Sequence, residues 1–343
     1  MRAYLQHIAT GATLSQQQAE EAMHLMMKGE AEPEEIAAFL MGLRTRGESL
    51  EELIGFTKVM RAYAIPVALA DKEAIDLCGT GGDQSGTFNV STTAAFVCAG
   101  AGVTVAKHGN RSISSKCGSA DVLAELGVAL ELGKEGVEYC LEKAGIAFIF
   151  APYFHPAMKY VMPVRRKLGT RTFFNILGPL CNPAGVRRQL VGAFSLEVAE
   201  TMGQILAALD AERVVALHAE DGLDECSIAA PTTTYFFDAP NGKTDKKQVD
   251  PAFFGLPTSP LSAIKGDSAQ ENAGLLKGVL EGKPGPHRDI VVMNATLGLW
   301  TSGKYADMNA CQQAAEESID SGSAMDSLSK LIEASQQAPK LSI

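Results

Sequence analysis

From about residue 74 the chain alternates short apolar runs with longer helical stretches, and this alternation restricts the fold more than any other feature. Each apolar run has the length of one strand, and the segments between them are long enough to return to a neighbouring parallel strand. We therefore expect an α/β fold with a mainly parallel sheet and helices on its faces. The predicted strands cover residues 74–77, 103–106, 147–150, 189–194, 213–218 and 289–293.

The first 70 residues contain only helical patterns. Ser15 with Gln18 and Ser49 with Glu52 have the spacing of capping boxes, and Pro33 stands where a first helical turn tolerates proline. These signals predict three short amphipathic helices that form a small helical unit. Beyond the first strand, residues 135–144, 196–209 and 308–337 also read as helical, and the polar stretch 240–260 reads as loops.

Composition excludes several classes of protein. The 343 residues are 46% hydrophobic and 20% charged, and the net charge of −10 disfavours a general nucleic-acid binder. The chain is long enough for two domains or one large α/β unit. Its seven cysteines have no metal-ligand spacing, and neither a signal sequence nor an apolar run of membrane-spanning length is present, so we expect a reduced, cytoplasmic protein.

Two stretches rich in glycine and hydroxyl groups follow the first two predicted strands, at residues 79–92 and 107–121. Glycines let backbone amides approach an anion, and Ser, Thr and Lys side chains complete such a cage. The first stretch lacks the glycine spacing of a dinucleotide fingerprint and the Gly-Lys-Ser/Thr of a Walker loop. A tight turn is the alternative for one such stretch, but two of them favour a ligand with several phosphate groups.

Two further segments bear on the site. The turn at residues 221–225 places carboxylates after a predicted strand, where they form either an acidic surface turn or a Mg²⁺ site. The segment 155–183 carries a run of basic residues that forms either a solvated helix face or, through Arg165, a carboxylate clamp. Of the histidines, only His108 is favoured for a functional role; His155 reads as a helix opener, His218 as structural, and His7, His24 and His287 as surface residues.

The four segments together resemble the anthranilate phosphoribosyltransferase family, in its order and over nearly the whole chain. The matching blocks are GTGGD…TFNVST from Gly79, KHGNRSISSKCGSAD from Lys107, HPAMK…RTFFNILGPLCNP from His155, and DGLDE from Asp221. Gln84 and Ala219 stand where the family commonly has glycine, which affects local loop shape. The resemblance implies transfer of the phosphoribosyl group of 5-phosphoribosyl 1-diphosphate (PRPP) to anthranilate, with release of diphosphate, in tryptophan biosynthesis.

The resemblance also implies a domain arrangement. It gives a helical domain at residues 1–70, completed by a segment near 165–190, and an α/β domain at residues 71–343 with the PRPP and metal sites. A homodimer formed through the helical domain is implied as well, with small-molecule substrates and no nucleic-acid or membrane partner.

Site residues follow by position within the matching blocks. Ser91, Asp224 and Glu225 would bind Mg²⁺, and anthranilate would contact Gly79, Asn110 and Arg165, with His108 nearby. The residues implied to line the PRPP site, some of them shared with the sites above, are Gly79, Gly82, Asp83, Thr87, Asn89, Val90, Ser91, Thr92, Lys107, His108, Gly109, Asn110, Arg111, Ser112, Ile113, Ser114, Ser115 and Ser119. No residue is assigned as a general base. The alternatives are a pyrimidine-nucleoside phosphorylase-like enzyme, which would not need the acidic pair, and a non-enzymatic nucleic-acid-binding relative, which should be basic.

Overall fold

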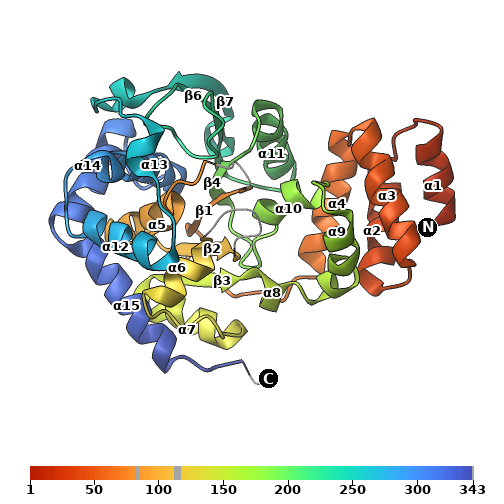
Figure 1. Cartoon of the computed structure of the whole chain (residues 1–343), viewed down its shortest axis with the longest axis horizontal. Helices are drawn as coiled ribbons and strands as arrows, with labels where there is room; N and C mark the ends of the chain where they lie inside the picture. Colours follow the sequence, from red (N-terminus) through yellow and green to blue (C-terminus); the bar gives the residue numbers. More distant parts are fainter. Residues whose placement is uncertain (82–84, 112–116, 342–343) are drawn as a thin grey trace.

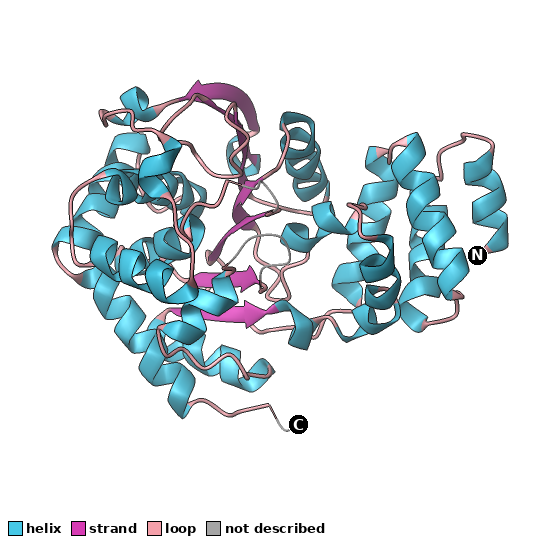
Figure 2. Cartoon of the chain, viewed as in Figure 1, coloured by secondary structure: helices cyan, strands magenta, loops and turns pink. Residues whose placement is uncertain are grey.

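The computed structural model describes residues 1–81, 85–111 and 117–341, and it has a helical part beside a larger α/β part (Figures 1 and 2). In the described chain the α/β part contains a seven-stranded sheet in the order β3-β2-β1-β4-β5-β6-β7. Pairing is parallel from β3 to β5 and antiparallel for β6 and β7. The expected α/β fold with a mainly parallel sheet is confirmed. The strands are β1 Ile75–Gly79, β2 Val105–Gly109, β3 Ile146–Phe150, β4 Arg188–Gly192, β5 Arg213–Ala219, β6 Thr232–Asp238 and β7 Lys243–Val249.

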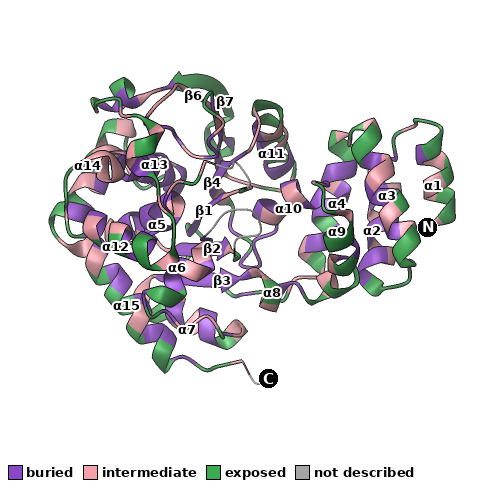
Figure 3. Cartoon of the chain, viewed as in Figure 1, coloured by how far each residue is buried: buried purple, intermediate pink, exposed green. Residues whose placement is uncertain are grey.

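Helices cover both faces of the sheet, and their inward sides are buried (Figure 3). The long α13 packs against α5, and α15 packs against α5 and α7. These helices are α5 Val90–Gly100, α6 Ser119–Glu125, α7 Lys134–Ala144, α8 Ala151–Phe154, α11 Leu196–Ala208, α12 Ala269–Leu280, α13 Pro286–Ser302, α14 Met308–Asp320 and α15 Ser323–Gln337. Short 3₁₀ turns occur at η1 Pro156–Tyr160, η2 Ala239–Asn241, η3 Pro251–Phe254 and η4 Leu261–Ile264.

The helical part joins the N-terminal helices to a segment from the middle of the chain. It consists of α1 Arg2–Ala9, α2 Gln16–Lys28, α3 Pro33–Arg46, α4 Leu50–Ala62, α9 Met162–Leu168 and α10 Phe174–Leu180. The Phe173 ring, just before α10, stacks on Phe56 of α4 at 4.4 Å and meets Phe39 of α3 edge-on. This aromatic cluster ties α9 and α10 to the N-terminal helices, as Figure 1 shows for α9 beside α3 and α4.

A buried carboxylate fixes the start of α4. Glu52 is fully buried, and its oxygens accept hydrogen bonds from the Leu14 amide at 2.8 Å and the Ser49 amide at 2.7 Å. The Arg46 guanidinium pairs with the same carboxylate. The capping boxes predicted at Ser15 and Ser49 are both present.

Several expectations about secondary structure are wrong. Residues 289–293 form no strand, because they lie in the middle of α13, a helix buried on nearly all sides whose apolar run imitates a buried strand. Four helices precede residue 63, and not the three that were predicted. The additional helix is α1, whose residues are only weakly apolar. Strands β6 and β7 were also missed, and β7 occupies part of the stretch read as loops; its residues are exposed except Val249, so it lacks the apolar pattern of a strand.

Two apolar cores meet at the sheet. Leu190 of β4 packs into the core beneath α5 and α13, whereas its neighbour Val191 packs into the core that continues into the helical part. Successive strand residues point to opposite faces, so one strand contributes to both cores. The helical part is therefore anchored directly to one face of the sheet.

Candidate active site

The site is centred where the strand order reverses, between β1 and β4. The chain proceeds from β1 to β2 and β3 on one side and then returns to β4 and β5 on the other. Gly79 and Gly192 are paired at the carboxyl ends of β1 and β4. In open α/β sheets ligands bind at such a reversal point, beyond the carboxyl ends of the strands.

The glycine pair leaves room for the acidic turn that follows β5. A Cβ atom on Gly192 would lie 1.6 Å from the Asp224 carbonyl oxygen, and one on Gly79 would lie 2.5 Å from the Asp224 Oδ2 atom. Any side chain at Gly192 would therefore overlap the backbone of the turn. Because Gly79 and Gly192 have no side chains, the Asp224 carboxylate can lie close to the carboxyl ends of β1 and β4.

Asp221, Asp224 and Glu225 have different roles in this turn. The Asp221 carboxylate accepts hydrogen bonds from the Leu223 amide at 3.3 Å and the Ser227 hydroxyl at 2.6 Å, which hold the turn itself. Asp224 accepts from the Gly81 amide at 2.7 Å, and Glu225 accepts from the Ser91 amide at 3.2 Å. The last two carboxylates thus reach the first glycine-rich loop and the start of α5, where the helix dipole favours negative charge.

Residues of the first loop surround the N-terminus of α5. The Asn89 side chain is held at both ends: its Nδ2 donates to the Cys117 carbonyl at 3.3 Å, and its Oδ1 accepts from Asn272 Nδ2 at 3.0 Å. Thr87 is half-buried, and Val90 is buried. The Thr92 hydroxyl is buried and has no hydrogen-bond partner within the described ranges. Thr87, Asn89, Val90 and Thr92 therefore lie together at one helix start.

Lys107 of β2 brings a buried cation to the same place. Its ammonium donates to the Leu77 carbonyl and lies 3.4 Å from the Ser91 hydroxyl. Only 3% of Lys107 is exposed, and beside it Asp76 is fully buried. Burial raises the pKa of Asp76 to about 6, while the Lys107 charge and hydrogen bonds from Asn182 and the His108 amide act in the opposite direction. The cation and this carboxyl form the floor of the site.

The second loop begins at Gly109 and leads into α6. The Asn110 Oδ1 atom accepts from the Arg111 amide at 2.7 Å, and the Arg111 guanidinium pairs with Asp121 at 3.0 Å. Asn110 and Arg111 are exposed, and Ser119, the first residue of α6, is half-buried. The polar side chains of Asn110 and Arg111 therefore remain accessible at the sheet edge.

Two histidines face each other beneath the loops. The Nε2 atoms of His108 and His155 are 3.3 Å apart, so one ring donates and the other accepts. Burial lowers the pKa of His155 to about 4 and holds the pKa of His108 well below its usual range, with the neighbouring His155 acting in the same direction on His108. Both rings are neutral at pH 7. His155 does precede a 3₁₀ turn, as expected, but its contact with His108 could not be inferred from its position before Pro156.

The other histidines differ in how far they match expectation. The His218 ring makes a 2.8 Å hydrogen bond with the Ala193 carbonyl, which agrees with a structural role. His287 is partly exposed, but its ring packs edge-on against Phe88 at 4.9 Å and its Nε2 atom is buried. A distant part of the chain covers it, which the local sequence does not reveal.

Arg165 lies on α9, in the segment that completes the helical part. Its guanidinium lies over the Phe174 ring at 5.2 Å and donates to the Met162 sulfur at 3.6 Å. Burial lowers the pKa of Arg165. Across residues 1–81, 85–111 and 117–341, no carboxylate lies within ion-pair distance of Arg165, so this partly buried cation is suited to a carboxylate ligand.

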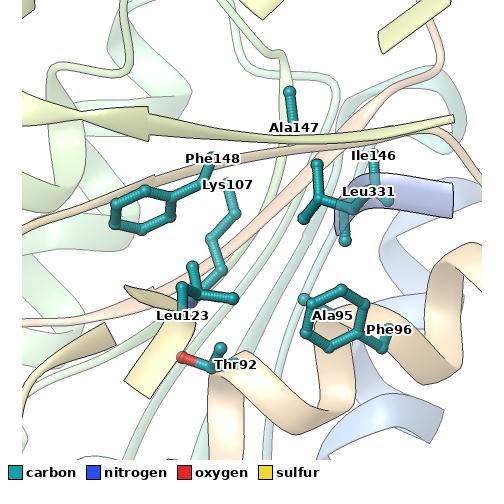
Figure 4. A pocket seen from close by; sticks show the side chains of 9 residues that line it. All are labelled: Thr92, Ala95, Phe96, Lys107, Leu123, Ile146, Ala147, Phe148 and Leu331. Atoms are coloured by element: carbon teal, nitrogen blue, oxygen red, sulfur yellow. The ribbon is translucent and has the colours of Figure 1, made fainter. Parts of the chain in front are cut away.

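Six of the predicted PRPP residues lie outside the described residues: Gly82, Asp83, Ser112, Ile113, Ser114 and Ser115. A cavity of about 10 Å³ is lined by Thr92, Lys107, Phe148 and six further residues, whose side chains are drawn in Figure 4. It lies in the core behind the loops and is too small for a phosphoribosyl group.

The donors at the acidic turn suit a hard cation. Asp224, Glu225 and Ser91 offer two carboxylates and a hydroxyl near one helix start, and Mg²⁺ prefers such oxygen ligands. Within the part of the chain that the structure describes, no group of three or more His, Cys, Asp or Glu side chains forms a metal cage. Two carboxylates and one hydroxyl would leave coordination positions of such a cation open to other ligands.

The helical part and the α/β part, with glycine-rich loops at the strand reversal point, correspond to the two domains of a glycosyl transferase family. The chain matches the glycosyl transferase family helical bundle domain over residues 2–64 and its a/b domain over residues 71–325. An anthranilate phosphoribosyltransferase from Salinibacter ruber is 58% identical over 341 residues, covering 98% of this chain and 99% of the relative. The same enzyme from Rhodopseudomonas palustris is 49% identical over 96% of this chain and 97% of the relative. The chain belongs to the anthranilate phosphoribosyltransferase family.

Solved structures agree with this assignment. The crystal structure of anthranilate phosphoribosyltransferase from Thermus thermophilus superposes with a TM-score of 0.91 at 39% identity, covering 97% of this chain and 99% of that one. The Saccharomyces cerevisiae enzyme in complex with PRPP and Mg superposes with a TM-score of 0.88 at 28% identity, covering 98% and 97%.

Proposed function

We propose that this protein transfers the 5-phosphoribosyl group of PRPP to the amine of anthranilate, giving N-(5-phosphoribosyl)anthranilate and diphosphate, in tryptophan biosynthesis. The observation that carries the proposal is the Gly79–Gly192 pair, which admits the Asp224 carboxylate at the strand reversal point. Asp224 reaches the first loop through the Gly81 amide, and the neighbouring Glu225 reaches the Ser91 amide at the start of α5. The Ser91 hydroxyl lies 3.4 Å from the buried Lys107 ammonium, so carboxylates, a helix start and a cation meet as a site for a Mg²⁺-bound diphosphate requires.

Residues of the two loops would bind PRPP. The amides at the start of α5 and of the second loop would donate to phosphate oxygens, and Lys107 would balance part of their charge. Asp224, Glu225 and Ser91 would hold Mg²⁺, which when bound neutralises charge on the departing diphosphate. Asp224 and Glu225 now accept amide hydrogen bonds, so they are already oriented toward the loop that the ligand would occupy.

Anthranilate would bind between the second loop and α9. Arg165 would pair with its carboxylate, and Gly79, Asn110 and His108 would complete the contacts. The amine of anthranilate is a weak nucleophile, so catalysis would depend on holding it near C1 of the ribose. His108 and His155 are neutral and buried, and we assign no general base.

The family resemblance supports a division into a helical domain at residues 1–70, completed near 165–190, and an α/β domain at 71–343. We extend the proposal to a cytoplasmic homodimer that associates through the helical domain. Within the described residues, no helix is both long and apolar enough to cross a membrane.

The test is an anthranilate-fluorescence assay with and without PRPP and Mg²⁺. We expect fluorescence to fall only when both are present, and Asp224→Asn combined with Glu225→Gln to abolish the fall at low Mg²⁺. Glu220→Gln is the matched control, because Glu220 lies in the same turn but is exposed and bonded to Gln248. Full activity of the double variant at low Mg²⁺ would disprove the metal assignment, and phosphate-dependent cleavage of a pyrimidine nucleoside would favour the phosphorylase alternative.

A further inference from the structure

A segment far along the chain pairs with the first glycine-rich loop. The Phe88 amide donates to the Ile264 carbonyl at 3.1 Å, and the Gly266 amide donates to the Gly86 carbonyl at 3.1 Å. Thr87 and Lys265 form an antiparallel bridge between these two bonds. Residues 264–266, which we call the strap, therefore lie along residues 86–88 as a short added strand.

Lys265 makes a second connection between the strap and the loop. Its ammonium donates to the Ser85 carbonyl, and it lies 3.7 Å from the position that a Cβ atom on Gly86 would take. Lys265 is exposed, so its side chain does not contribute to the apolar core. A charged donor on a loop carbonyl restricts residues 85 and 86, which precede the predicted PRPP residues Thr87 and Asn89.

Two helices support the strap and the loop from behind. Asn272 of α12 donates to the Asn89 Oδ1 atom at 3.0 Å. The His287 ring of α13 packs on Phe88 at 4.9 Å and hydrogen-bonds the Lys265 backbone. The fit is close, because a Cβ atom on Gly266 would lie 1.9 Å from Asn272 Oδ1 and 3.0 Å from the Phe88 Cα.

We propose that Lys265 is a positioning residue for PRPP: through the strap it holds residues 85–89 in the conformation that binds the diphosphate portion of this substrate. The inference rests on the proposed function, since it assigns the loop to PRPP. Lys265 is not placed in contact with the substrate. It acts by restricting a glycine-containing loop, so that less conformational entropy is lost when the ligand binds.

The test compares Lys265→Met, Lys265→Arg and Gly266→Ala in the full-length protein. Lys265→Met keeps the apolar stem and removes only the charged donor, so we expect the PRPP KM to rise about tenfold, the size expected for loss of one charged hydrogen bond. The anthranilate KM should not change, and Lys265→Arg should restore the PRPP KM. Gly266→Ala should also raise the PRPP KM. Gly274→Ala on α12 is its control, because a Cβ atom there meets nothing within 4 Å.

Titration with inorganic diphosphate and Mg²⁺ by calorimetry provides a measurement that does not depend on turnover. We expect weaker binding in Lys265→Met than in the wild-type protein, and recovery in Lys265→Arg. Unchanged diphosphate affinity and PRPP KM in Lys265→Met would overturn the inference, as would an equal rise in both substrates' KM values. Failure of the proposed function would appear differently, as a wild-type protein that consumes no anthranilate in the presence of PRPP and Mg²⁺.

Discussion

Replacing Gly192 by alanine tests whether the opening at the strand reversal point is required for activity. The added Cβ atom would lie 1.6 Å from the Asp224 carbonyl oxygen and 2.6 Å from the carbonyl carbon, and both are backbone atoms that cannot rotate away. Because real Cβ atoms stay at least 3.0 Å from such neighbours, the turn and β4 must separate by about 1.4 Å. The shift would move Asp224 and Glu225 away from the first loop.

Gly192→Ala is expected to lower both stability and activity. Overpacking of this kind costs about 1–3 kcal/mol of stability. A displacement of about 1 Å in a positioning group lowers activity roughly a hundredfold. We therefore expect Gly192→Ala to remain folded but to lose most activity, with a higher Mg²⁺ concentration needed for half-maximal rate.

The assay is loss of anthranilate fluorescence across a Mg²⁺ titration, with thermal unfolding measured in parallel. Gly79→Ala provides a contrast, because its nearest neighbour would be the Asp224 side chain at 2.5 Å, which can rotate. It should lose less stability than Gly192→Ala but lose activity similarly, since the displaced atom is the proposed metal ligand. Wild-type activity and Mg²⁺ dependence in Gly192→Ala would refute this account of the site.

Three further predictions concern separate parts of the molecule. Arg165→Ala should raise the anthranilate KM by tenfold or more while the PRPP KM stays unchanged, since a charged hydrogen bond is lost; an unchanged anthranilate KM in steady-state assays would exclude the clamp. The pKa of Asp76 is raised to about 6, so its stabilising protonated form is fully present below about pH 4 and is lost as pH rises to about 6. Denaturation across this range should show a fall of about 3 kcal/mol that Asp76→Asn removes, and an equal fall in the variant would contradict this reasoning. Glu52→Ala should cost about 3–5 kcal/mol in denaturant unfolding, because the Leu14 and Ser49 amides and the partly buried Arg46 all lose a fully buried carboxylate; a cost below about 1 kcal/mol would contradict this role of Glu52.

Local patterns predicted most of the regular structure correctly. The capping boxes at Ser15 and Ser49 involve residues three positions apart, so their geometry follows from the sequence alone. Residues 289–293 were predicted as a strand but lie in α13, because here the local pattern is misleading. A helix buried on nearly every side has no polar stripe, so its apolar run carries no helical period.

The predicted site residues came from motif positions, and the structure adds contacts that no motif contains. The buried pair of His108 and His155 is 47 positions apart, and Lys265 reaches the first loop from 180 positions away. Nothing in the neighbourhood of Lys265 marks it, because its contact is with a backbone carbonyl. Lys265 lies at the loop because side chains of α12 and α13 hold the strap and the loop together.

Local periodicity and turn residues indicate the order of strands, helices and glycine-rich loops. The fold class and the substrate class could therefore be inferred before the structure. The tertiary structure decided how these loops are held. The sequence predicts Gly79 in a phosphate-binding loop and Gly192 inside a strand, and only strand pairing shows that both make way for Asp224. Side chains from distant segments meet when the sheet closes, and the energies of those contacts depend on burial and distance, which local sequence does not encode.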